Sequence, residues 1–240
     1  THTPLLFFSS DGFVYKLKTW RLPQSGRNSK GKAIVNLLPI NSLARITTIL
    51  PVEAAEETWK DLQIFFATST GNVRKNALSD FTNVKANGKI AMKLPENTTL
   101  IGAQICKNDN DVLLTTAQGK AIRFNTEDVR IFKGRDSVGV RGISLKKDDA
   151  VISMAILQHI EVSTEERLAY FKMRRAITGE DSGVENDEIS TLVLSQERYV
   201  ELGALEEWIL TITSQGFGKR SSAHEYRRSG RGGQGITSAN

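Results

Sequence analysis

The chain has 240 residues, of which 25% are charged and 39% are hydrophobic, and a formal net charge of +5. This composition excludes a disordered tail, and no apolar run approaches the roughly 20 residues that a membrane-spanning helix needs. The first apolar run, residues 5–8, is too short for a signal peptide and lacks a basic flank. A lone Cys106 cannot form an internal disulfide, which indicates a reducing, cytoplasmic environment. Because the chain opens on Thr1, we expect it to be a segment of a longer protein.

The repeats are the first feature along the chain. Four segments share an apolar run, a polar turn ending in glycine, and a basic strand. A β-branched or aromatic run, a glycine free to adopt positive φ, and a second strand predict a β-hairpin. The hairpins are expected over residues 5–16, 63–75, 112–123 and 209–220, and their turn glycines are Gly12, Gly71, Gly119 and Gly216.

Each repeat continues beyond its hairpin. A basic loop follows, over residues 21–32, 85–89, 130–141 and 227–231. Apolar strands are expected next, over residues 33–38, 90–94 and 140–145, and short apolar runs then cover residues 46–50 and 150–154. Four strands in a repeat of about 48 residues predict a blade, and blades arranged about an axis form a propeller-like array. We therefore predict an all-β array of about four four-stranded blades, forming one domain over residues 1–240.

The last repeat is separated from the third by 97 residues between turn glycines, about twice the preceding spacing of 48. This gap contains residues 158–207, which hold 12 acidic and 5 basic residues. A capping box over residues 163–166 predicts a helix over 164–175, and a loop over 176–188 and a second helix over 190–203 are expected to follow. We interpret 158–207 as a partly helical acidic insertion that rests on a blade, contacts another subunit or weakens the binding of an anionic partner electrostatically.

Outside this insertion the chain carries 15 acidic and 27 basic residues, a balance of +12. A cation excess of this size points to a polyanionic partner, with nucleic acid first and an acidic membrane surface second. Charge alone leaves a merely solvated surface as the alternative.

No enzymatic constellation accompanies this charge. The three histidines are too scattered for a zinc signature. Residues 26–33 copy a phosphate-binding loop until Ala33 replaces the hydroxyl that binds magnesium. Residues 230–235 fit a dinucleotide motif without its strand–helix–strand context. We expect no cofactor, no metal and no catalytic residue in this segment.

Several strings resemble the C-terminal domain of the A subunit of DNA gyrase. They are FSSDGFVYKLK (residues 8–18), GKAIVNLL (31–38), GKAIRF (119–124), GVRGI (139–143) and GFGKR (216–220). The resemblance covers nearly all of the chain outside 158–207. It implies a six-bladed β-pinwheel that wraps duplex DNA on a basic rim without base specificity, and the four repeats resemble its second to fifth blades. The family's first-blade signature box has no strict copy here, because residues 228–235 match it only in composition.

The resemblance also implies a biological context. The segment would be a non-catalytic domain of an ATP-hydrolysing type II DNA topoisomerase, supporting negative supercoiling, with ATP and Mg²⁺ used by the whole enzyme. Its implied partners are duplex DNA, the rest of the gyrase A subunit and the gyrase B subunit. Its implied location is the chromosome in the bacterial cytoplasm, with no membrane partner. The equivalent domain of topoisomerase IV is the alternative within this class. A propeller used as a protein-interaction scaffold is the alternative outside it.

We predict that lysines and arginines of successive blades bind successive phosphates along a curved path. Affinity would then come from charge neutralisation and counterion release. The candidate DNA-binding residues are Lys16, Lys18, Arg21, Arg27, Lys30, Lys32, Arg74, Lys75, Lys85, Lys89, Arg123, Arg130, Lys133, Arg135, Arg141, Lys219, Arg220, Arg227, Arg228 and Arg231.

Overall fold

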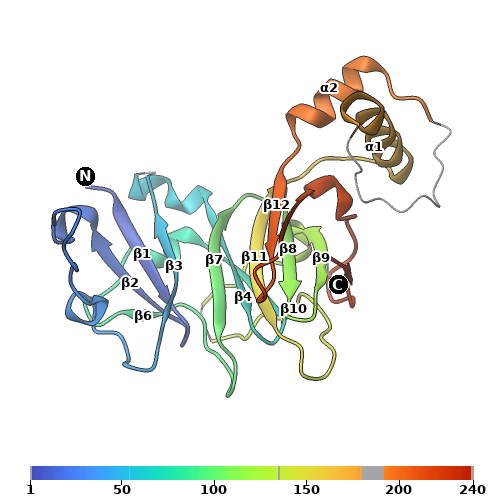
Figure 1. Ribbon diagram of the computed structural model, residues 1–240. Helices are drawn as coiled ribbons and strands as arrows, with labels where there is room; N and C mark the ends of the chain where they lie inside the picture. Colours follow the sequence, from blue (N-terminus) through green and yellow to red (C-terminus); the bar gives the residue numbers. More distant parts are fainter. Residues whose placement is uncertain (1, 54, 135, 180–191, 239–240) are drawn as a thin grey trace.

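The computed structural model describes residues 2–53, 55–134, 136–179 and 192–238 (Figure 1). In these residues the chain forms three four-stranded antiparallel sheets, one two-stranded hairpin and two α-helices. The strands are β1 (Pro4–Ser9), β2 (Phe13–Lys18), β3 (Ile46–Pro51), β4 (Gln63–Thr68), β5 (Asn72–Ala77), β6 (Lys89–Ile90), β7 (Leu100–Cys106), β8 (Asn110–Thr116), β9 (Lys120–Asn125), β10 (Val140–Arg141), β11 (Val151–Gln158), β12 (Trp208–Ile212), β13 (Gly218–Ser222) and β14 (Ile236–Thr237). The helices are α1 (Thr164–Thr178) and α2 (Gln196–Ala204).

The four predicted hairpins are present as β1–β2, β4–β5, β8–β9 and β12–β13. All four turn glycines have φ between +72° and +85°, a region that a residue with a Cβ adopts only at a cost. A short 3₁₀ helix begins seven residues after each of these glycines. These helices are η1 (Thr19–Arg21), η4 (Leu78–Phe81), η5 (Thr126–Asp128) and η6 (Ala223–Glu225).

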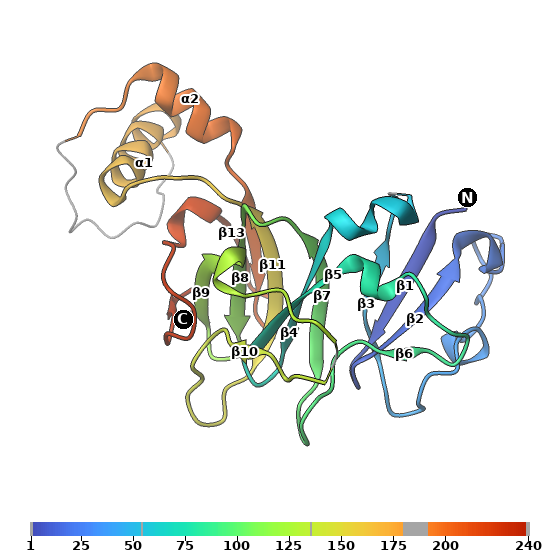
Figure 2. The ribbon, with the colours of Figure 1, turned by 180° about the vertical axis from the view of Figure 1, so that it is seen from behind.

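The sheets differ from the prediction in one respect, because successive repeats share strands. The orders are β3-β1-β2-β6, β10-β5-β4-β7 and β11-β8-β9-β14. Three strands of each blade therefore come from one repeat, and the short strand β6, β10 or β14 comes from the next repeat. The expectation that one repeat builds one blade was wrong. The basic loop is long enough to carry the short strand back to the preceding hairpin (Figure 2).

The strand sharing adds a second reason for glycine at the turns of the first two repeats. The carbonyl oxygen of Gly71 accepts hydrogen bonds from the amides of Gly142 (2.8 Å) and Ile143 (3.2 Å), which follow β10 directly. A Cβ on Gly71 would lie 2.7 Å from the carbonyl oxygen of Ile143. The first repeat uses the same arrangement, with Gly12 accepting from Ala91 and Met92.

The predicted strand over residues 33–38 is not a strand. It contains the 3₁₀ helix η2 (Ile34–Asn36), and the amide of Leu37 donates to the carbonyl of Ile34 at 2.9 Å. Its equivalents in the later repeats each pair with the hairpin before them. Residues 34–36 pair with no strand in the described part of the chain, and a local turn bond, from the amide of Asn36 to the carbonyl of Ala33 at 3.0 Å, forms here instead.

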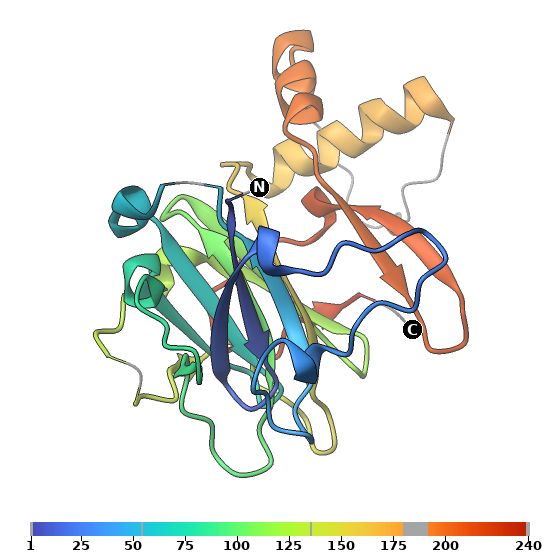
Figure 3. The ribbon, with the colours of Figure 1, turned by 90° about the vertical axis from the view of Figure 1, so that its left-hand side faces the viewer.

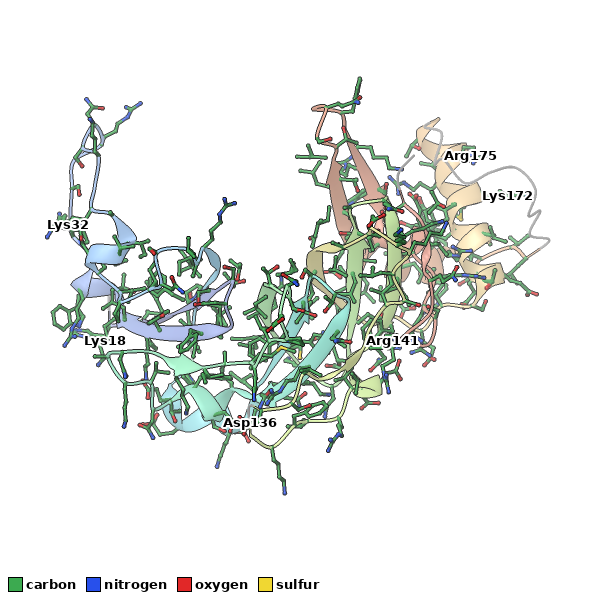
Figure 4. The ribbon with its side chains drawn as sticks, turned by 90° about the horizontal axis from the view of Figure 1, so that it is seen from below. Lys18, Lys32, Asp136, Arg141, Lys172 and Arg175 are labelled. Atoms are coloured by element: carbon green, nitrogen blue, oxygen red, sulfur yellow. The ribbon has the colours of Figure 1, made fainter. Side chains whose placement is uncertain are left out.

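The core lies between the blades. Phe66 of β4 packs edge-to-face with Phe8 of β1 (5.6 Å between ring centroids) and with Phe81 (5.9 Å). The neighbouring residue Phe65 packs against Phe124 of β9 at 6.3 Å. Because successive side chains of a strand point to opposite faces, β4 contributes to both neighbouring interfaces. The blades consequently follow one another in a row. Figure 3 looks along this row from the first blade, and Figure 4 shows from below that the row curves into an arc.

The insertion forms a helical unit beside this arc (Figure 1). Ser163 and Glu166 make the predicted capping box, and α1 continues one turn beyond the prediction to a left-handed cap at Gly179. Helix α2 begins later than predicted, after Ser195, whose hydroxyl accepts from the amide of Arg198. The two helices bury their own apolar cluster. It comprises Ala169, Tyr170, Phe171, Leu194 and Leu202. Residues 180–188 of the predicted loop lie outside the described residues.

Candidate nucleic-acid interface

Most of the predicted cations lie exposed on loops that follow the hairpins, or on the last hairpin itself. Lys18, at one end of the arc, and Arg141, further along it, are labelled in Figure 4. The exposed members of the predicted set are Lys18, Arg21, Arg27, Lys30, Lys32, Lys85, Arg130, Lys133, Arg141, Lys219, Arg220, Arg227, Arg228 and Arg231. Arg135 lies outside the described residues.

Three predicted cations are buried and should be removed from the set. Arg74 is 0% exposed, Lys75 is 3% exposed and Arg123 is 7% exposed. Arg74 donates to the carbonyls of Ser137 and Gly134, in the loop of the next repeat. Burial lowers the pKa of Lys75, against the opposing effect of nearby acidic groups. These side chains lie on second strands that the next repeat covers, so phosphate cannot reach them.

Two further predicted cations are partly buried and bound to protein acceptors. The ammonium of Lys16 donates to the carbonyl of Thr82 at 2.9 Å and forms an ion pair with Glu56. The ammonium of Lys89 donates to the carbonyl of Asp80 at 2.6 Å. Neither is a strong candidate for contact with a phosphate.

The structure brings cations from different repeats together at the first blade. A shallow pocket is lined by Lys18 and Arg21 from the first repeat and by Lys85 from the second. Asn83 lines the same pocket and was missed by the sequence analysis. The only feature of the sequence that could have indicated Asn83 is its position two residues before Lys85. Amide side chains bind phosphate oxygens as donors, so Asn83 joins the candidate set.

The longest basic loop, residues 21–32, extends from the first blade. Arg27, Lys30 and Lys32 are all exposed on it, and the labelled Lys32 lies on this loop in Figure 4. A turn closes within the loop, where the amide of Ser29 donates to the carbonyl of Gly26 at 3.0 Å. The loop therefore presents three cations to solvent on a short span of backbone.

The loop of the third repeat carries the next cations. The guanidinium of Arg130 stacks 4.3 Å from the centroid of the Phe132 ring, which holds its charged end at the surface. Lys133 and Arg141 are exposed on the same loop, as is Asp136, which lies between them in the sequence and is labelled in Figure 4. Gly139 permits the close approach of this loop to β5, because a Cβ there would lie 2.2 Å from the carbonyl oxygen of Val73.

The loop of the fourth repeat meets both the third repeat and the insertion. Arg231 donates to the carbonyls of Asp128 (2.9 Å) and Arg141 (3.1 Å), so this loop packs beside the preceding basic loop. Arg228 lies 3.2 Å from Nε2 of His159 and 4.0 Å from a carboxylate oxygen of Glu161, where the insertion begins. The insertion thus engages one cation of the predicted set directly.

In the described residues no group of three or more His, Cys, Asp or Glu side chains is placed to hold a metal ion. The same part of the chain has no helix of the length and apolarity needed to cross a membrane. Exposed cations, in contrast, are present on the loops of all four repeats.

A family model described as "DNA gyrase C-terminal domain, beta-propeller" matches residues 3–39, 63–107, 110–158 and 207–240. The chain belongs to this DNA gyrase C-terminal domain family. Each matched segment begins at or close to one of the four hairpins. The unmatched residues 159–206 contain both α-helices, so the helical unit is an insertion relative to the family's repeats.

Curated relatives agree with this assignment. The chain is 46% identical to the A subunit of DNA gyrase from Granulibacter bethesdensis, and the match covers 100% of this chain and 27% of that protein. It is also 46% identical to the A subunit of DNA gyrase from Rickettsia bellii, over 98% of this chain and 26% of that protein. The chain thus spans about a quarter of the length of these curated relatives.

A crystal structure of the C-terminal domain of DNA topoisomerase IV superimposes with a TM-score of 0.69 and 19% identity, covering 98% of this chain and 58% of that one. At this identity the likeness shows a shared fold and nothing finer.

Proposed function

We propose that this gyrase-family domain binds duplex DNA without base specificity and bends it along the arc of blades. The observation that carries the proposal is the contrast between the two sets of cations. Three of the seven predicted cations on hairpin strands are buried by the next repeat, whereas every one of the four repeats carries exposed cations on the loop after its hairpin. The exposed cations therefore recur with each repeat, as contacts to a periodic polyanion require.

The physical basis is neutralisation of phosphates. Each Lys or Arg that meets a phosphate releases condensed counterions, so affinity falls with salt in proportion to the number of contacts. Bending a site of 20–30 base pairs costs about 1–6 kcal/mol. Contacts from several blades at once can repay that cost, while one blade alone cannot.

The names of the relatives support a wider proposal for the parent protein. We infer that this domain serves a gyrase, in which the rest of the A subunit, together with the B subunit, performs strand passage with ATP and Mg²⁺ in the bacterial cytoplasm. The high identity to A subunits of gyrase favours gyrase over topoisomerase IV. A protein-interaction scaffold leaves the exposed cations on every repeat unexplained.

Binding to fluorescent duplexes at several salt concentrations tests the proposal. The log–log salt slope should be about −0.9Z for Z neutralised phosphates, with the same slope for different sequences. A duplex long enough for several blades should bind more tightly than one that reaches a single blade. Equal affinity for the two lengths would contradict bending, and affinity confined to particular sequences would indicate base readout.

A matched pair of variants sharpens this test. Lys133→Glu reverses an exposed charge on a basic loop, and Lys172→Glu makes the same change on exposed α1 of the insertion. Lys133→Glu should weaken binding of all sequences and flatten the salt slope by about one contact. Equal weakening by Lys172→Glu would show that the net charge of the domain governs binding, and not the cations of the basic loops.

A further inference from the structure

One position recurs in every hairpin, four residues after the turn glycine. It holds Lys16, Lys75, Arg123 and Arg220. In the first three repeats its cationic group donates to a backbone carbonyl of the next repeat, in or directly beside the 3₁₀ helix that follows that repeat's hairpin. These three side chains therefore form hydrogen bonds between successive blades.

The bond between the second and third blades is fully enclosed. The ammonium of Lys75 donates to the carbonyl of Thr126 at 2.9 Å and to the Oδ1 of Asn108 at 3.3 Å. The backbone is tied in the opposite direction, since the amide of Phe132 donates to the carbonyl of Lys75 at 2.8 Å. Lys75 thus joins β5 to three residues of the segment that follows β7.

Arg123 repeats this arrangement between the third and fourth repeats. The guanidinium of Arg123 donates to the carbonyl of Ala223 at 2.8 Å. The amide of Ser229 in turn donates to the backbone carbonyl of Arg123 at 2.8 Å. An ion pair with buried Asp111, at 2.8 Å, fixes the orientation of the guanidinium. Ala223 and Thr126 occupy the same place in their repeats, seven residues after the turn glycine.

Lys16 makes the corresponding bond between the first and second repeats. Its ammonium donates to the carbonyl of Thr82, which directly follows η4, and lies 5.1 Å from the ring centroid of Trp59. Glu56 pairs with the same ammonium. This bond is less buried than the other two, so a variant here perturbs folding least.

Burying a cation between two blades costs free energy, so burial alone does not explain why a cation stands at this position. A buried ammonium or guanidinium loses its hydration, and an apolar side chain of similar volume often stabilises a fold as well or better. A charge-assisted hydrogen bond does supply direction, because it ties the end of a fixed-length side chain to one carbonyl. One such bond lies between each pair of successive repeats. Small changes in the angle between neighbouring blades therefore accumulate along the arc.

We propose that Lys16, Lys75 and Arg123 are positioning residues that set the angle between successive blades, and through it the curvature of the path offered to DNA. The angle itself is a property of the protein alone. Its effect on DNA rests on the proposed function, so the two parts are tested separately.

The angle is measured first, without DNA. Nitroxide labels at Leu43→Cys and Lys107→Cys report the distance between the first and second repeats, since both side chains are exposed. Lys16→Met should lengthen and broaden the distance distribution, and Lys16→Arg, which keeps a donor, should restore it in part. Lys18→Met removes a charge two residues away on β2 and should leave the distribution unchanged. Circular dichroism and a thermal melt confirm that each variant is folded.

The DNA part uses energy transfer between the two ends of a bound duplex. Lys16→Met should reduce the bend of the complex and leave binding to a short duplex unchanged. Lys18→Met should do the reverse, weakening binding about fivefold near 0.15 M salt, as expected when one phosphate contact is lost. An unchanged distance distribution in Lys16→Met would overturn the proposal, since the apolar stack alone would then set the angle. If the domain without any substitution binds no DNA, the proposed function fails. The distance measurement then still decides whether Lys16 sets the angle between the blades.

Discussion

The third blade and the last hairpin begin from the same sequence pattern and reach different states. In the β8–β9 hairpin, residues 111–114 and 121–124 are all buried. In β12–β13 the burial alternates or is lost, with Leu210 68% exposed and Ile212 66% exposed. The third blade receives β11 and β14 as further strands, while in the described residues β12 and β13 pair only with each other.

This difference teaches that a hairpin is specified locally, whereas its burial is supplied by its neighbours. A two-stranded hairpin is marginally stable in water, and three or more strands or a packed partner are needed for stability. In an array of repeats, stability is approximately a sum of repeat and interface contributions. Substitutions at equivalent places should therefore have large effects in the enclosed blades and small effects in the last hairpin.

The largest contrast is expected between two phenylalanines. Phe66 is 0% exposed between the first two blades, and Phe217 is 71% exposed at the turn of the last hairpin. Phe66→Ala should lower the free energy of unfolding by about 3–5 kcal/mol, because it leaves a cavity. Phe217→Ala should change it by about 0.5 kcal/mol or less. Denaturant unfolding measures both, and similar losses would show that the last hairpin is as well packed as the blades.

The turn glycines give the next contrast. Gly71 and Gly216 have nearly the same φ, +82° and +85°, but a Cβ meets the Ile143 carbonyl oxygen at the first and nothing within 4 Å at the second. Gly216→Ala should cost only the backbone strain, about 1–2 kcal/mol. Gly71→Ala should cost more, because β10 must shift as well. Equal losses in thermal or denaturant unfolding would mean that strand sharing contributes nothing at this turn.

Replacing residues 160–206 with a short Gly/Ser linker should have a smaller effect on the blades. The helices bury a cluster of their own, and they meet the sheets mainly near η6, where Tyr170 packs against His224. Cooperative β unfolding should persist, and binding of DNA at low salt should tighten because Arg228 loses Glu161. Collapse of the β circular dichroism would show that residues 160–206 are required by the blades.

The smallest contrast concerns pH and two carboxylates in equivalent capping boxes. Hydrogen bonds from the Ser163 amide and from Arg198 lower the pKa of Glu166, so its stabilising effect is complete above about pH 4.3 and is lost in more acidic solution. Burial raises the pKa of Glu225, so its ionisation opposes folding and the cost grows as the pH rises past about 4.3.

Each of the variants Glu166→Gln and Glu225→Gln should change stability at pH 7 by less than about 1 kcal/mol, downward for the first and upward for the second. Both differences should vanish below pH 3–4, roughly where the carboxyls are protonated. Unfolding measured across pH distinguishes the two signs.

The local features of the fold were predictable because they depend on nearby residues. The four hairpins, their turn glycines and the capping box at Ser163 were all confirmed. The partners of the short strands were not predictable, since nothing within residues 140–145 says that they pair with β5 rather than with a strand of their own repeat. The burial of Lys75 and Arg123 was missed for the same reason. A basic residue on a strand reads as exposed until the covering segment, some fifty or a hundred residues later, is known.

The sharing of strands also has a consequence for synthesis on the ribosome. A blade is finished only after the following repeat has left the exit tunnel, so the growing chain always carries one sheet with an open edge, the kind of surface on which chains aggregate. The third sheet waits longest, because β9 ends at Asn125 and β14 begins at Ile236, after the helices. At bacterial-scale elongation of 5–20 residues per second this delay is roughly 5–20 s. The helical unit, which closes its own apolar cluster, is translated entirely within that interval.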